Sequence, residues 1–135
     1  MIDYQGWVIL HPHWEEEKEE YDKFRSLIED INIFIKETNP IGTIFSHVSG
    51  INGFKRFVFC GAANRMSHEF ELLYKLFDKI AKQAPGSHGI LYLQDDEGDN
   101  IDEYVCFVMR MGRIFVEKDC FFSPVSTMVD GEIDI

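Results

Sequence analysis

The chain has 135 residues, with 24 acidic and 13 basic side chains and a formal net charge of −11 at pH 7. Its length corresponds to a single domain, residues 1–135, and a hydrophobic content of 45% with twelve phenylalanines argues against disorder. Nucleic acid and anionic membranes need a basic surface and are disfavoured as direct partners. The negative charge is typical of a surface that serves solubility, and the alternative is long-range attraction of a basic partner protein.

The first part of the chain predicts a strand followed by a long helix. Residues Tyr4 to Leu10 are rich in aromatic and β-branched side chains, which is typical of a strand. Apolar residues at spacings of three and four predict a helix from Glu15 to about Glu37, and Asn39-Pro40 ends it. We expect Trp7 and Trp14 to be core aromatics.

A hairpin is predicted next, because Asn52-Gly53 is a strong signal for a two-residue turn. The two strands cover residues 43–51 and 54–61, with Ile51 opposite Phe54. In this register, Val48 and Phe57 fall on the more apolar face, which we expect to be the core side.

The second half of the chain predicts another helix and three more strands. Ser67 is the expected N-cap of a helix that reaches Ala84. The consecutive apolar residues Ile90 to Leu93 predict a central strand that is buried on both faces. A second hairpin is expected around Gly112-Arg113, with strands over residues 104–111 and 114–117. Residues 119–135 are expected to form a loosely structured tail.

The element order β-α-β-β-α-β-β-β, with short connections, predicts the fold class. We expect an α+β fold with one mainly antiparallel sheet of about six strands and two helices packed on one face.

Carboxylates are concentrated in the loop that follows the predicted central strand. Six of them occur in nine residues without a base, namely Asp95, Asp96, Glu97, Asp99, Asp102 and Glu103. Calcium is disfavoured, because Asn100 stands where an EF-hand loop requires Gly and Cys106 where it requires Glu. The loop is therefore either a solvated turn or a surface that binds a partner.

Two further segments are candidates for partner binding. Asn64-Arg65 lies between a strand and a helix, where the Arg can pair with a partner's carboxylates or, within the domain, with Asp95 or Asp96. The start of the first helix carries a second acidic cluster, namely Glu15, Glu16, Glu19 and Glu20.

No catalytic or metal-binding motif is present, so we expect no catalytic residues, no metal and no cofactor. His68-Glu69 does not continue to the zinc pattern, because Leu72 stands where the second His is needed. Cys60 with His47 is the one nucleophile and base pair to test, but the hairpin register places Phe45 opposite Cys60. A small hydrolase or transferase remains an alternative, as does a structural adaptor, which would expose an apolar patch.

The cysteines and the absence of targeting signals predict a cytoplasmic protein. Cys60, Cys106 and Cys120 are odd in number and lack a CxxC spacing, and we expect Cys60 and Cys106 to be reduced core residues. The first ten residues lack the features of a signal peptide, and no apolar run approaches the roughly 18 residues of a membrane span.

Several of these segments together resemble family 7 of the immunity proteins of bacterial polymorphic toxin systems. The matching segments are Gly6-Trp7, Phe59-x-Gly61, Asn64-Arg65, Ala84-Pro85-Gly86-Ser87-x-Gly89-Ile90-Leu91-Tyr92 running into Asp95-Asp96-Glu97, and Phe122-Ser123-Pro124. The family commonly has a His between the Asn and the Arg, which are adjacent here. The resemblance implies an α+β inhibitor that binds and blocks a cognate toxin domain. If that toxin is a nuclease, the acidic loop can mimic a polyanion in its active site.

Overall fold

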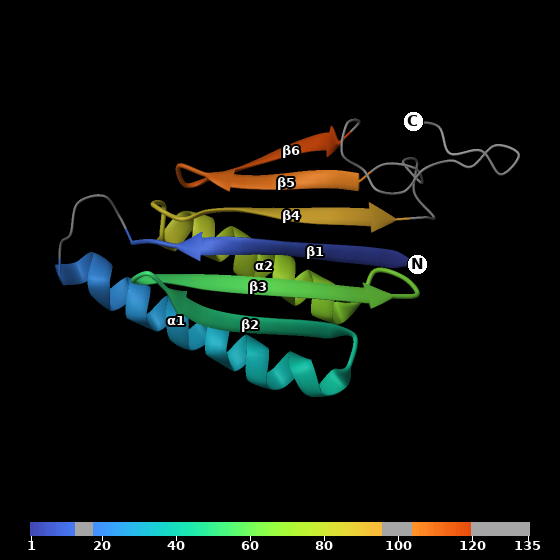
Figure 1. Ribbon diagram of the computed structural model, residues 1–135, viewed down its shortest axis with the longest axis horizontal. Coiled ribbons are helices and arrows are strands. Elements are labelled where there is room, and N and C mark those ends of the chain that lie inside the picture. Colours follow the sequence, from blue (N-terminus) through green and yellow to red (C-terminus); the bar gives the residue numbers. More distant parts are fainter. Residues whose placement is uncertain (13–17, 96–103, 120–135) are drawn as a thin grey trace, which may run out of the picture.

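The computed structural model describes residues 1–12, 18–95 and 104–119, apart from the side chains of residues 18–20. Six strands form one sheet in the order β2-β3-β1-β4-β5-β6, and every neighbouring pair is antiparallel (Figure 1). The elements are β1 (Ile2–Leu10), α1 (Lys18–Thr38), the 3-10 turn η1 (Asn39–Ile41), β2 (Ile44–Ile51), β3 (Phe54–Ala63), α2 (His68–Gln83), β4 (His88–Asp95), β5 (Tyr104–Arg110) and β6 (Arg113–Asp119). The α+β prediction is confirmed. Of the expected tail, Asp119 ends β6, and residues 120–135 lie outside the described residues.

Both helices pass behind the sheet in the view of Figure 1, and they cover the same face. The alternation of burial along β1 follows from this arrangement, because Tyr4 and Val8 are fully buried whereas Gln5 and Trp7 are exposed. We call the side opposite the helices the open face of the sheet.

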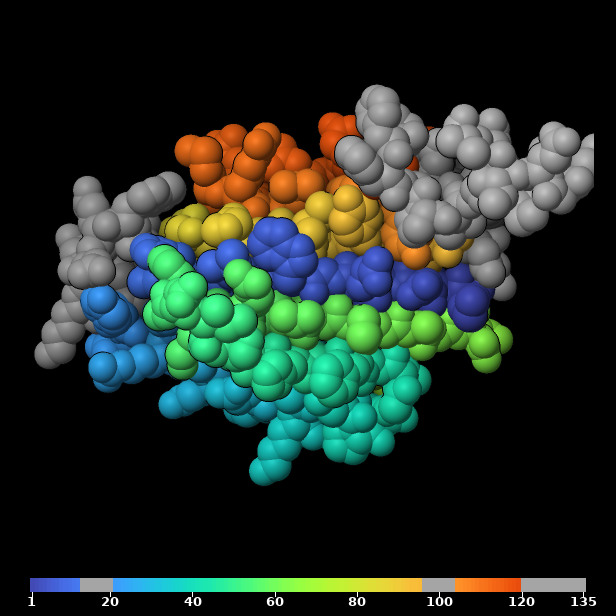
Figure 2. Space-filling model, viewed as in Figure 1, coloured from blue at the N-terminus to red at the C-terminus, as the bar shows by residue number. Residues whose placement is uncertain are grey.

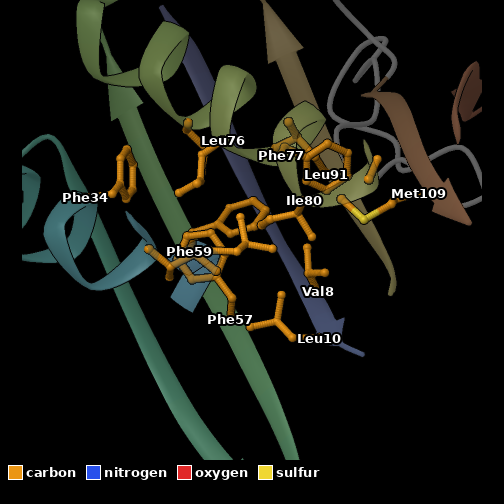
Figure 3. Packing of buried hydrophobic residues seen from close by; sticks show 14 of the residues in the cluster. Val8, Leu10, Phe34, Phe57, Phe59, Leu76, Phe77, Ile80, Leu91 and Met109 are labelled. Carbon is orange, nitrogen blue, oxygen red and sulfur yellow. The ribbon is translucent and has the colours of Figure 1, made fainter. Parts of the chain in front are cut away.

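Aromatic side chains from three elements form the centre of the core between the helices and the sheet (Figure 3). Phe59 of β3 lies between Phe57 and Phe77, with ring centroids 5.2 and 6.5 Å away. Phe34 of α1 meets Phe57 edge-on at 6.2 Å. Full burial of such a side chain contributes about 1.5–3 kcal/mol, so these rings fix the helices against the sheet.

Local signals set the ends of both helices. Ser67 caps α2 as predicted, since its Oγ accepts a hydrogen bond of 3.1 Å from the backbone N–H of Phe70. Helix α1 ends at Thr38 and continues as η1, which contains Asn39 and Pro40. The predicted start of the first helix, Glu15, lies outside the described residues. The described part of α1 begins at Lys18.

The predicted register of the first hairpin is confirmed. Ile51 lies opposite Phe54 and Val48 lies opposite Phe57. The second hairpin differs by one residue, because its turn is Met111-Gly112 instead of Gly112-Arg113. Both of its turn residues have positive φ, 53° for Met111 and 74° for Gly112, which is the geometry that a two-residue turn between antiparallel strands demands.

Three burial predictions are wrong, and the open face explains each of them. Strand β4 does lie centrally, between β1 and β5, but the helices cover only one of its faces, so Leu91 is buried while Ile90 is partly exposed. Trp7 is 41% exposed, and Cys60 is also exposed. Both side chains point to the face without helices. The prediction for Trp14 falls on a residue outside the described part of the chain.

Candidate functional site

The register of the sheet brings two predicted binding segments to the same end of the molecule. Ala63, the last residue of β3, and Asp95, the last residue of β4, both lie opposite Ile2 of β1. Adjacent strands are about 4.8 Å apart, so the ends of β3 and β4 are about 10 Å apart. Asn64-Arg65 continues from one of these ends, and the acidic loop continues from the other. We call this end of the sheet, where β3 and β4 finish, the acidic end.

The structure describes the predicted site residues unevenly. Asp95 is partly buried, and Asn64 and Arg65 are exposed in the turn after β3. The predictions for Asp96, Glu97, Asp99, Asp102 and Glu103 fall outside the described residues. The loop that holds them leaves β4 at Asp95 and enters β5 at Tyr104.

Arg65 is presented to solvent at the acidic end. It forms no ion pair with Asp95 or with any other residue that the structure describes, so the predicted tie to Asp95 is not formed. The salt bridges of the described helices lie elsewhere, between Lys79 and Asp30 at 2.6 Å and between Lys82 and Asp78 at 2.7 Å. The alternative tie, from Arg65 to Asp96, falls outside the described residues.

The second acidic candidate lies at the opposite end of the sheet. Strand β1 runs from the acidic end to Leu10, and α1 begins beyond that point (Figure 1). Glu19 and Glu20 are in the first turn of α1, whereas Glu15 and Glu16 lie outside the described residues. At about 3.3 Å per residue, nine residues of β1 separate the two candidates by roughly 30 Å. They are therefore two separate surfaces.

The geometry around Cys60 does not resemble a nucleophilic site. Cys60 lies opposite Phe45 and Gln5, and His47 is two residues along β2, as predicted. A shallow depression of about 520 Å³ beside Cys60 is also lined by Asp3 and lacks a lysine, arginine or histidine. A reactive thiolate needs electropositive surroundings, which this depression does not supply.

The shifted pKa values of the described residues all favour the uncharged form. Burial raises the pKa of the Cys106 thiol, and it also raises the pKa of Tyr92 to about 12, with smaller contributions from Cys106 and Asp119. These groups are neutral at pH 7, unlike an activated nucleophile or base. Within the described ranges, no group of three or more His, Cys, Asp or Glu side chains is placed to hold a metal ion.

The most distinctive sequence segment, Ala84 to Tyr92, has a structural task. The Ser87 side chain is buried and makes two hydrogen bonds to the end of β1: its Oγ accepts from the His11 N–H at 3.0 Å and donates to the His11 carbonyl at 3.1 Å. A Cβ on Gly86 would lie 2.1 Å from the Pro12 carbonyl oxygen, so only glycine allows this approach. These residues fix the start of β4 beside the end of β1, at the opposite end of this strand pair from Asp95.

The chain matches a known protein family. A family model described as Immunity protein 7 matches residues 1–131, so the chain belongs to this family and is an immunity protein of a toxin system. No curated protein and no solved structure matched the chain. None of the helices in the described ranges is long and apolar enough to cross a membrane.

The sequence interpretation missed the exposed apolar side chains of the open face. Trp7 and Val58 are 41% and 39% exposed, and they lie opposite each other on β1 and β3. The sequence of β1 contains a signal for such a surface. Gln5, Trp7 and Ile9 lie on one face of the strand, Tyr4, Val8 and Leu10 lie on the other, and both sets are largely apolar. A strand with two apolar faces predicts two buried faces, and here the helices cover only one of them.

Proposed function

We propose that this protein neutralises its cognate toxin by binding it one to one, without catalysis of its own. The contact is made by the acidic end of the sheet, with Asp95, Asp96, Glu97, Asp99, Asp102 and Glu103 supplying negative charge and Asn64 and Arg65 supplying directional hydrogen bonds. The observation that carries this proposal is that Ala63 and Asp95 both lie opposite Ile2. The segments that follow them therefore leave the sheet at the same end.

The negative charge of this protein supports a basic toxin as its partner. A net charge of −11 attracts a positive partner over a long range and speeds its capture. The toxin class that we propose is a nuclease, because an enzyme that binds phosphates needs a basic active site that carboxylates can occupy. The proposed location is the cytoplasm, which is consistent with the free thiols of Cys60 and Cys106.

The test is calorimetric titration of the toxin domain encoded by the neighbouring gene, in an inactive form. One variant changes Asp95, Asp96 and Asp99 to Asn and Glu97 to Gln. The matched control changes Glu15, Glu16, Glu19 and Glu20 to Gln, which removes the same charge at the opposite end. We expect tight 1:1 binding that the first variant weakens at least tenfold more than the control does, since close charge pairs are worth about 1.5 kcal/mol or more each.

The outcomes separate the parts of the proposal. Equal binding by the wild type and the first variant would move the contact away from the acidic end and retain the immunity function. A loss of binding confined to the control variant would assign the contact to the start of α1. Failure of the wild type to bind the toxin would reject the proposed function and return attention to an enzyme or an adaptor.

A further inference from the structure

One residue from each of the six strands forms a continuous row across the open face. The cross-strand pairs run from His47 to Val58, then to Trp7, Ile90, Val108 and Phe115. Five of these six side chains are apolar. We call this set the central row, and Figure 2 views the molecule onto the face that carries it.

The central row remains accessible to solvent. Trp7 is 41% exposed, and Val58 and Phe115 are each 39% exposed, while Phe45 in the adjacent row of β2 is 62% exposed. Single exposed apolar side chains are common on protein surfaces, but a contiguous set marks an interaction site. Tryptophan in particular dominates binding energy when a partner desolvates it.

The charges on either side of the central row have opposite sign. On each strand, the next open-face position lies two residues from the central row. Toward the hairpin turns, these positions include Arg56, His88, Arg110 and Arg113, and none of them is acidic. In the other direction, it carries the exposed Glu117 two residues away and the partly exposed Asp3 four residues away, whereas Asp119 on the same face is buried. The open face thus has an apolar centre, a basic side and an acidic side.

We propose that the toxin docks on the open face, with the central row as the apolar core of the interface. This inference rests on the proposed function and extends it, because the acidic end then forms the rim of a larger contact. Six strands span about 24 Å across and the charged sides lie about 20 Å apart, which supplies much of the roughly 800 Å² that a stable complex needs from each partner. The matching toxin surface is apolar in its centre and basic where it meets the acidic side.

A second copy of this chain fits the open face less well than a basic partner does. Each copy carries a net charge of −11, so the approach of two copies is opposed by long-range repulsion. A toxin of opposite charge gains from the same field. The charge difference between the two sides also gives the docked toxin one preferred orientation.

The test uses two valines that are exposed on opposite sides of the sheet. Val58→Lys changes the central row, and the matched control Val116→Lys changes a β6 side chain that is 54% exposed and lies opposite Phe107, away from the open face. Phe45→Lys is the second test variant, since its 62% exposure makes the fold insensitive to the change. The measured quantity is the Kd for the inactive toxin domain of the neighbouring gene, with thermal melting to confirm that each variant is folded.

We expect Val58→Lys and Phe45→Lys to weaken binding by about 30-fold or more, and Val116→Lys to change it by less than about threefold. Wild-type binding that both test variants retain in full would overturn the inference and leave the proposed function standing. A wild type that does not bind would reject the proposed function itself. Light scattering provides a further check: a wild-type dimer that Val58→Lys converts to a monomer, with unchanged toxin affinity, would make a second copy the occupant and overturn the inference.

Discussion

Tyr4 places a hydroxyl group inside the hydrophobic core. Its side chain is fully buried, packs edge-on against Phe70 at 4.9 Å and lies directly over Gly61, where an added Cβ would come within 2.4 Å of the ring. The hydroxyl oxygen makes no hydrogen bond within the described residues. A buried hydroxyl without a partner costs about 1–3 kcal/mol, so the ring stabilises the fold and the hydroxyl does not.

Alkaline unfolding provides a prediction for this residue. Burial, followed by the charges of Glu69 and Cys60, raises the pKa of Tyr4 from 10.0 to about 12. The neutral phenol is therefore favoured in the folded state, and its contribution is fully present below pH 10 and lost as the pH rises to about 12. We expect Tyr4→Phe to be at least as stable as the wild type at pH 7 and to lose about 2–3 kcal/mol less between these two pH values.

The measurement is urea unfolding at several pH values from 8 upward. Tyr21→Phe is the control, since Tyr21 is 40% exposed and the same atom is removed. A Tyr4→Phe protein that is destabilised at pH 7 would show that the hydroxyl has a partner in solution. An alkaline loss equal to that of the wild type would show that folding does not raise the pKa of Tyr4.

At the scale of elements, the edge strand β2 is held by the residue that follows α1. Asn39 donates from Nδ2 to the Ser46 carbonyl at 3.0 Å and accepts at Oδ1 from the Ser46 N–H at 3.0 Å. The Ser46 hydroxyl donates to the same oxygen at 3.1 Å. These bonds satisfy backbone groups that an edge strand otherwise offers to another chain.

Asn39→Ala tests this contact. We expect a loss of about 1–3 kcal/mol in the free energy of unfolding, because two backbone groups and one hydroxyl lose their partner. Hydrogen exchange gives the specific readout, since the Ser46 amide should exchange at least tenfold faster. Asn32→Ala, on the exposed face of α1, is the control. Unchanged protection of the Ser46 amide would contradict the contact.

The elements also show what the sequence could predict. Asn52-Gly53 combined with one apolar face determined the register of the first hairpin, because a shift of one residue would have moved Phe57 and Phe59 out of the core. The Met111-Gly112 turn was missed, since a methionine at positive φ has no sequence signal. Asn64-Arg65 and the acidic loop were predicted as two candidate segments, with a tie from Arg65 to Asp95 or Asp96 as one alternative. The pairing of β3 and β4 with β1 is what places both segments at one end of the sheet. The open face was missed because apolar residues on both faces of a strand do not reveal which face is covered.

At the scale of the whole molecule, charge and contact are separable. Changing either set of four acidic residues to amides, at the acidic end or at the start of α1, alters the formal net charge from −11 to −7. Long-range attraction depends on this overall charge and is screened beyond about 10 Å at 0.1 M salt. Short-range contacts depend on which end the toxin touches.

This separation predicts different kinetics for the two variants. We expect both to slow toxin association by a similar factor of about 3–10 at low ionic strength, because steering follows the overall field. Only the variant at the acidic end should also speed dissociation, since lost contacts act on the dissociation rate. Stopped-flow mixing and surface plasmon resonance at low and high salt measure the two rates. Faster dissociation of the α1 variant alone would place the toxin at the opposite end of the sheet, where the same net charge would still explain its rapid capture.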